Sequence, residues 1–261
     1  MARSRLGVAV VRGRPTARRG QAARRAAIAC GAVLGGCLQL EETIVIGPDG
    51  SGTQQVVMTM PERTLAEARR AAAVNQTAAG DPQALFVRET VQKELTAAGL
   101  ELVAHETKNL EGSRRVALTA KFASPQVLRA SPLSGTTATW EFAPGPAPGT
   151  VEVTLYPQGK QAWTEARAKA EAMKTEVDAV AADFFDKRKA QLTGLDVTLR
   201  FKLPGKVLRL TRNLEQTADD EVTARITADR IRTAEDLVRW LAPRFQVVFD
   251  ASGCPAFPID R

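Results

Sequence analysis

Short runs of alternating apolar and polar residues fill the chain after residue 37, and clusters of glycine and proline separate them. Residues 38–46 and 53–60 are two such runs, and the turn-forming segment 47–52 between them predicts a β-hairpin. Further strands are expected at residues 100–107, 114–122, 136–142, 150–156, 195–203, 207–210, 222–226 and 245–249. Because most of these strands follow one another through short turns, the sheet is expected to be mostly antiparallel.

Helical patterns lie between these strands. Pro61 is expected to begin one helix, and Pro82 begins a second that ends at Gly99. Thr233, with Asp236 three residues later, predicts a capping box at the start of a third helix. Hairpins with helices between them predict an α+β fold, with one long amphipathic helix besides these shorter ones.

The longest helix is expected over about residues 159–193, a segment without proline. Its small and apolar residues recur at alternating steps of three and four, which is the seam of a helix that packs along its length. The seam comprises Trp163, Ala166, Ala170, Met173, Val177, Val180 and Phe184. Such a stripe usually packs across the domain's own sheet, and it also suits a partner helix or a lipid. The candidate ligand or partner surface is therefore formed by Trp163, Met173, Val177, Val180 and Phe184.

The net positive charge of the chain comes from its first 36 residues. The 261-residue chain has 36 basic and 29 acidic residues and a formal net charge of +7. Residues 1–36 contain eight arginines and no acidic residue, so the remaining chain is almost neutral. A protein that binds nucleic acid needs a basic face on its folded part. The composition therefore argues against nucleic acid as a partner.

Residues 1–36 have the order of an export signal: basic residues, then an apolar stretch, then small residues before Cys37. The apolar stretch, residues 26–34, is shorter than the roughly 20 residues that a membrane-spanning helix needs. The segment 34–37, of sequence LGGC, resembles the lipobox of bacterial lipoproteins. This resemblance implies cleavage between Gly36 and Cys37 and a diacylglycerol on the Cys37 thiol.

Two alternatives stay open for the leader. One is an ordinary cleaved signal with an incidental cysteine, and the other is twin-arginine export directed by Arg24-Arg25. With a lipid on Cys37, the mature chain of residues 37–261 is expected to be one lipid-anchored domain, because two acyl chains hold a protein durably on a membrane. The expected location is the cell membrane or the outer membrane, with the domain facing the periplasm or the exterior.

Two segments resemble bacterial lipoproteins of the LppM-like class. Residues 37–61 run from the lipobox cysteine through a strand and a PDGSG turn to a second strand. Residues 201–207, of sequence FKLPGKV, resemble a later element of the class, in which a strand bends towards a hairpin. The resemblance implies an envelope domain that handles lipids. The chain departs from the class because it has no apolar run for a C-terminal transmembrane span.

Residues that most catalytic and metal sites require are sparse. His105 is the single histidine, which argues against a histidine-based triad and a multi-histidine metal site. The acidic turn 219–221 is expected to be solvated rather than cation-binding, and Cys254 is expected to be an unreactive, partly buried thiol. We therefore expect no catalytic residue, no metal and no cofactor.

The expected function is that of a non-enzymatic envelope lipoprotein that binds a lipid, another amphiphile or another envelope component. A protein–protein scaffold that uses the long helix is the alternative, and an enzyme is the least favoured hypothesis. The expected partners are the membrane, through the lipid on Cys37, and a lipid or an envelope protein. A structure separates the first two hypotheses, since it shows whether the seam residues line a cavity or fill a core.

Overall fold

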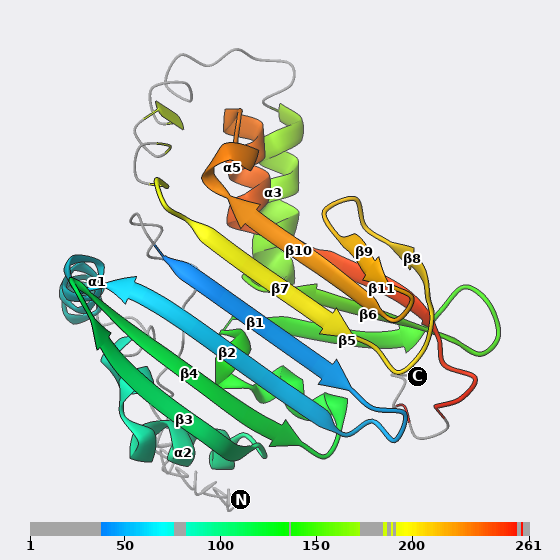
Figure 1. The fold of residues 1–261 in the computed structure, drawn as a ribbon. Coiled ribbons are helices and arrows are strands. Elements are labelled where there is room, and N and C mark those ends of the chain that lie inside the picture. The colour runs from blue at the N-terminus through cyan, green and yellow to red at the C-terminus, as the bar shows by residue number, and fades with distance from the viewer. Residues whose placement is uncertain are drawn as a thin grey trace, which may run out of the picture.

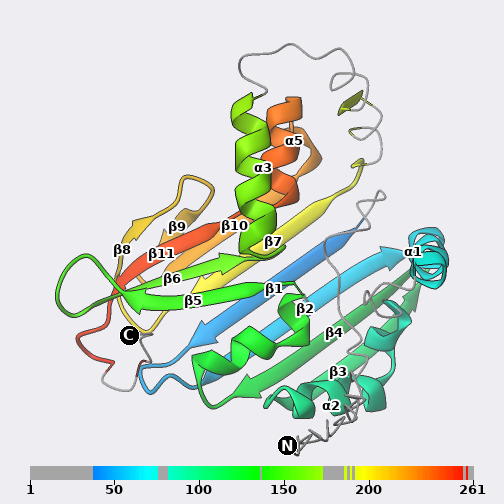
Figure 2. The ribbon, with the colours of Figure 1, turned by 180° about the vertical axis from the view of Figure 1, so that it is seen from behind.

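The computed structural model of the chain describes residues 38–75, 82–135, 137–172, 185–186, 189, 192–254 and 257. These residues form two facing sheets with a pair of helices at one end (Figures 1 and 2). The fold is α+β and mostly antiparallel, as predicted. The expected signal, its cleavage site at Gly36 and the lipidation site Cys37 lie outside the described residues.

The larger sheet has seven strands and contains the predicted first hairpin. Its strands are β1 (Gln39–Ile46), β2 (Gly52–Pro61), β3 (Glu101–Leu110), β4 (Ser113–Phe122), β7 (Asp196–Lys202), β9 (Glu215–Ala218) and β10 (Glu221–Thr227). Their order across the sheet is β3-β4-β2-β1-β7-β10-β9. Every neighbouring pair is antiparallel except β1 and β7, which run parallel. Parallel pairing needs a long crossover between the two strands, and residues 47–195 supply it.

The smaller sheet has four strands and is antiparallel throughout. Its strands are β5 (Thr139–Pro144), β6 (Thr150–Tyr156), β8 (Val207–Leu210) and β11 (Phe245–Asp250), in the order β5-β6-β11-β8. The chain passes from the larger sheet to the smaller one between β7 and β8, at the LPGK segment 203–206. Gly205 permits this crossover, because a Cβ at this position would lie 1.8 Å from the carbonyl oxygen of Asp250.

Four α-helices are described: α1 (Glu62–Asn75), α2 (Arg88–Ala97), α3 (Lys160–Ala172) and α5 (Ala234–Leu241). The predicted capping box is present at α5, where the Thr233 hydroxyl accepts from the Asp236 amide and the Asp236 carboxylate accepts from the Thr233 amide. The helix expected from Pro82 to Gly99 is divided into a 3-10 turn, Pro82–Phe86, and α2. Val87, whose backbone is extended, separates the two.

The core lies between the two sheets and beneath α2. Inward-facing strand residues are almost all apolar, and Trp140 of the smaller sheet meets Phe201 of the larger one edge to face at 5.9 Å. The smaller sheet covers the β1–β7–β10 half of the larger sheet, whereas α2 packs on β3 with Val91 and Leu95 (Figure 2). One face of the larger sheet is therefore covered and the opposite face is open.

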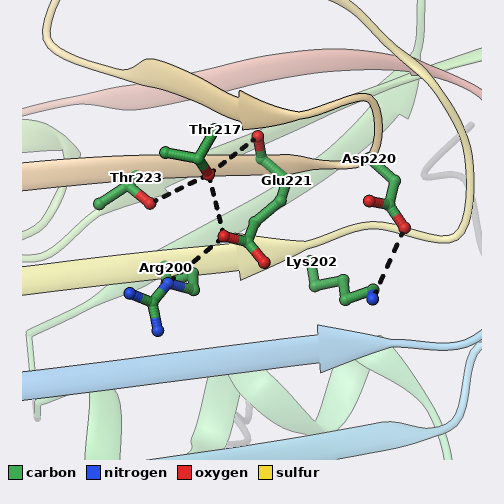
Figure 3. Close-up of polar contacts among 6 residues, drawn as sticks. All are labelled: Arg200, Lys202, Thr217, Asp220, Glu221 and Thr223. Atoms are coloured by element: carbon green, nitrogen blue, oxygen red, sulfur yellow. Dashed lines mark hydrogen bonds and ion pairs between the residues drawn. The ribbon is translucent and has the colours of Figure 1, made fainter.

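The open face of the larger sheet is polar. Arg200 lies 3.4 Å from Glu221, which also accepts a hydrogen bond from Thr217 at 2.9 Å (Figure 3). Lys202 lies 3.9 Å from Asp220. The acidic turn is thus ion-paired with its neighbouring strand rather than gathered around a cation. Exposed pairs of this kind contribute at most about 1 kcal/mol each, so they add little to the stability of the fold.

Only the first part of the predicted long helix is described, so the prediction that its seam packs across the domain's own sheet is not tested over its length. Helix α3 ends at Ala172 as described, and its main neighbour is α5, with which it lies side by side in both views (Figures 1 and 2). Residues 192–194 form a turn, so the helical segment ends before residue 192 rather than at 193. Residues 173–184 lie outside the described part. Within the described residues, no helix has the length and apolar character needed to cross a membrane.

Candidate functional site

An apolar cavity of about 80 Å³ lies where the two sheets and α5 meet. Leu40 and Leu199 line it from the larger sheet, Leu155 and Phe245 from the smaller one, and Leu237 from α5. At roughly 10–15 Å³ for each water-sized group, it has room for roughly five to eight such groups. Protein interiors have few voids larger than one water molecule, so this cavity departs from ordinary packing.

One carboxyl group, that of Glu42, interrupts the apolar wall of this cavity. Glu42 is on β1 and only 7% exposed. The amide nitrogen of Gln54, a residue of β2 with 0% exposure, donates to Glu42 Oε1 at 2.6 Å. The hydroxyl of Ser134 donates to the same oxygen at 3.5 Å. Both donors therefore converge on one oxygen of the carboxyl group.

The two donors to Glu42, Gln54 and Ser134, make further hydrogen bonds of their own. Gln54 Nε2 also donates to Ser134 Oγ at 2.9 Å, and Trp140 Nε1 donates to the same hydroxyl at 3.4 Å. The hydroxyl of Ser131 donates to Gln54 Oε1 at 2.6 Å. In this arrangement the buried Gln54 amide uses both its carbonyl and its NH₂ group. The network fixes the Glu42 side chain between the sheets.

Oε2, the second oxygen of Glu42, accepts no hydrogen bond from a described residue. In the described part of the chain, no side-chain nitrogen or oxygen is both fully occluded and unpaired. Oε2 therefore retains contact with open space, and we infer that this space is the cavity that Glu42 lines. The Glu42 carboxyl group thus has one oxygen without a described partner, in a cavity whose other lining residues are mostly apolar.

Burial raises the pKa of Glu42 from its ordinary value of 4.5 to about 7. The cause is the loss of solvation of the carboxylate, which the hydrogen bonds from Gln54 and Ser134 offset in part. Among the described residues that line the cavity, Glu42 is the only titratable one. Near neutral pH, the gain or loss of one proton at Glu42 therefore switches the cavity wall between a neutral and a charged state.

The alternation of side chains along β1 and β2 places Glu42 and Gln54 on the buried face of the sheet. Side chains alternate between the two faces of a strand, and the inward positions of the first strand are Leu38, Leu40, Glu42, Ile44 and Ile46. Gln54 shares its inward parity with Val56, Met58 and Met60 on the next strand. Glu42 lies opposite Val56, so Gln54 is its diagonal neighbour across the pair. The sequence analysis did not identify either residue, although this parity was the signal.

The fold is similar to that of an LppM domain. The solved structure is the NMR structure of the folded domain of LppM from Mycobacterium tuberculosis, which matches with a TM-score of 0.40 and 9% sequence identity. The match covers 83% of this chain and 91% of that one. No protein-family model and no curated protein sequence matches the chain.

Trp163, the one described member of the predicted ligand surface, lies outside the cavity beside Glu42. Its half-buried ring contacts Tyr156 at 5.5 Å between centroids, and the guanidinium group of Arg244 lies 4.8 Å from its centre. It lines a separate, open cleft of about 710 Å³ between α3, α5 and the outer face of the smaller sheet. The structure therefore does not bring Trp163 together with Glu42. The other members, Met173, Val177, Val180 and Phe184, lie outside the described residues.

The open cleft is rich in arginine. Arg239 pairs with Glu171 and Glu235. Arg209 and Arg212 are exposed, and their side chains make no ion pair or hydrogen bond with a described residue. The five arginines of the cleft are Arg167, Arg209, Arg212, Arg239 and Arg244, and its two acidic residues are Glu152 and Glu171. The cleft therefore suits an acidic surface better than an apolar one.

His105 and Cys254, the sequence candidates for other chemistry, make ordinary structural contacts. His105 Nε2 lies 2.8 Å from the carbonyl oxygen of Leu85, so this nitrogen is the donor. Cys254 is buried, its thiol lies 3.8 Å from the carbonyl oxygen of Pro204, and burial raises the pKa of that thiol. Among the described residues, no group of three or more His, Cys, Asp or Glu is placed to hold a metal ion.

Proposed function

We propose that the protein is a non-enzymatic envelope lipoprotein that binds a small amphiphile, or the end of a larger one, in the cavity beside Glu42. The single observation that carries this proposal is the cavity: a mostly apolar chamber between two sheets with one titratable group, Glu42, on its wall. Ligand sites are commonly apolar concavities in which a few polar groups fix the orientation of the ligand. The cavity has this composition, whereas the cleft at Trp163 does not.

The proposed lipid anchor lies one residue from this cavity. Leu38 lines the cavity, and Cys37 directly precedes it in the chain. Consecutive Cα atoms are 3.80 Å apart. A diacylglycerol on Cys37 would therefore attach beside the cavity wall, and the membrane would be the nearest source of amphiphiles. The proposed partners are thus the membrane and a lipid, at the periplasmic or outer side of the envelope.

The proposal includes no chemical step. Ser134 carries the hydroxyl that lies nearest to Glu42 on the cavity wall, and that hydroxyl is already engaged with Gln54, Trp140 and Glu42 itself. A hydroxyl that serves as a nucleophile needs a base that takes up its proton and space for a substrate. The Ser134 hydroxyl instead positions the carboxyl group.

The arginine-rich cleft favours a second candidate function, that of a scaffold for another envelope protein. Its occupant would be an acidic segment, because Arg209 and Arg212 lack partners among the described residues. Trp163 would supply an aromatic contact of the kind that is enriched at interfaces. Loss of binding to a partner in Arg209→Ala and Arg212→Ala, with amphiphile binding unchanged, would support this function.

Calorimetric titration with hexan-1-ol tests the first proposal. The full chain should carry Cys37→Ser, so that no acyl chain of its own competes for the cavity. We expect saturable binding that is weakened by Leu199→Phe, which fills the cavity, and is unchanged by Leu208→Phe on the surface, where Leu208 is 54% exposed. Absence of binding, or equal binding in all three proteins, would overturn the proposal.

A further inference from the structure

We propose that the cavity selects amphiphiles whose headgroup donates a hydrogen bond, a hydroxyl or an ammonium group, and rejects those with an anionic headgroup. The inference rests on the proposed function, since it names the class of ligand for the same cavity. It comes from the direction of the hydrogen bonds around Glu42. These bonds leave one carboxyl oxygen for the ligand.

Glu42 Oε1 is already engaged by its protein neighbours. It accepts from Gln54 Nε2 at 2.6 Å and from Ser134 Oγ at 3.5 Å. Gln54 is held in this orientation because Ser131 donates to its carbonyl oxygen at 2.6 Å. Rotation of the amide would place two acceptors against each other, so the network holds the donors towards Oε1.

Because Oε1 takes both donors and Glu42 lines the cavity, Oε2 is the oxygen that we assign to the cavity, and it has no partner among the described residues. The ligand must supply that partner, because an unpaired carboxyl oxygen away from water is costly. When the carboxyl is ionised, only a donor satisfies Oε2. When it is protonated, the proton resides on Oε2, since Oε1 accepts from two donors, and a ligand hydroxyl then serves as acceptor.

The other lining residues of the cavity also disfavour an anionic headgroup. Of the described lining residues, the polar ones besides Glu42 are Ser134 and Gln158, and none is basic. The pKa shift of Glu42 comes from burial and from its neutral hydrogen-bond donors, so no charge of a nearby described residue compensates the carboxylate. An anionic headgroup would therefore meet a like charge in an apolar setting, where the repulsion is poorly screened. A hydroxyl tolerates both states of Glu42, whereas an ammonium group prefers the ionised one.

A matched series of six-carbon ligands tests the inference: hexan-1-ol, hexylammonium and hexanoate. Each is titrated into the Cys37→Ser chain at about pH 5.5 and about pH 8.5, on either side of the Glu42 transition. We expect hexylammonium to bind about tenfold more tightly at the higher pH, as one charge-assisted hydrogen bond allows. Hexanoate should weaken over the same interval, and hexan-1-ol should change little.

Two variants make the outcome specific to Glu42. Glu42→Gln keeps the acceptor for Gln54 but cannot ionise, so it should abolish the pH dependence for hexylammonium and improve hexanoate binding. Glu41→Gln, at the exposed neighbouring position on the opposite face, should leave all values unchanged. Binding of all three ligands without discrimination, or unaffected by Glu42→Gln, would overturn the inference and leave the proposed function standing. Failure of all three ligands to bind would overturn both.

Discussion

The side-chain amide of Gln54 donates to the carboxyl group of Glu42 at 2.6 Å, and both residues are almost fully excluded from solvent. Two polar side chains on adjacent strands thus point into a core where every neighbouring position of the same parity is apolar. Burial of such groups destabilises a fold unless each finds partners. Here the partners are supplied by Ser131 and Ser134, so the arrangement is specific rather than accidental.

The free energy of unfolding should fall as pH rises through the Glu42 transition. Burial raises the pKa of Glu42 from 4.5 to about 7 on folding, so the folded state holds the proton more tightly than the unfolded state. The contribution is complete below the unfolded pKa, decreases between the two values and is absent above about pH 7. At about 1.36 kcal/mol for each pKa unit, the loss is on the order of 3 kcal/mol.

Urea unfolding at about pH 5 and about pH 8 measures this decrease. Glu42→Gln retains the shape of the protonated side chain and should remove the decrease, so that the variant is the more stable protein at the higher pH. Glu41→Gln serves as the matched control and should keep the parental behaviour. A parental decrease that persists in Glu42→Gln would assign the pH dependence to other groups.

Gln54→Ala should destabilise the protein by roughly 2–4 kcal/mol, because it removes a fully buried side chain and leaves its partners Glu42 and Ser131 unsatisfied. Gln55→Ala, one position along β2 and exposed, should change stability by less than about 0.5 kcal/mol. Chemical denaturation of the two variants side by side provides the comparison. Similar losses in both would show that the network contributes nothing beyond strand propensity.

Gly205→Ala should destabilise the crossover between the sheets. The added Cβ would lie 1.8 Å from the carbonyl oxygen of Asp250, so the backbone must shift where Asp250 also donates to Lys206. Gly253→Ala adds the same atom where nothing lies within 4 Å and should be neutral. Thermal unfolding should show a lower midpoint only for Gly205→Ala, and equal midpoints for both variants would contradict the steric explanation of the LPGK segment.

Cys37→Ala should abolish incorporation of a fatty-acid analogue and should either release the protein from membranes or leave it as an uncleaved precursor. The reason is that the diacylglycerol is attached through the Cys37 thiol in the proposed lipobox. Metabolic labelling followed by fractionation measures both outcomes. Cys30→Ala, in the apolar stretch of the leader, is the control and should label normally. Label that persists in Cys37→Ala would contradict the lipoprotein assignment.

Much of the fold could be predicted from local sequence signals. The first hairpin, the capping box at Thr233 and the last strand are where alternation, turn residues and the cap place them. Strand β9, Glu215–Ala218, was missed because all four of its residues are exposed, so it has no apolar alternation. Its pairing with β10 is a tertiary effect that local pattern does not encode.

The candidate site was harder to predict than the fold. Glu42 interrupts the alternation of apolar and polar residues along the first strand. This interruption marks a carboxyl group on the buried face. The cavity itself joins residues as far apart in sequence as Leu40 and Phe245, and such distant contacts leave no local pattern. The seam around Trp163 was prominent in the sequence, yet its described part packs beside α5, away from the cavity.

The position of a bound amphiphile tests the central claim most directly. Intermolecular nuclear Overhauser effects between hexan-1-ol and the leucine methyl groups of the Cys37→Ser chain report which side chains surround the ligand. We expect cross-peaks to Leu199 of the larger sheet and Leu237 of α5, which both line the cavity. Cross-peaks confined to exposed residues such as Leu208, or to the surroundings of Trp163, would contradict it.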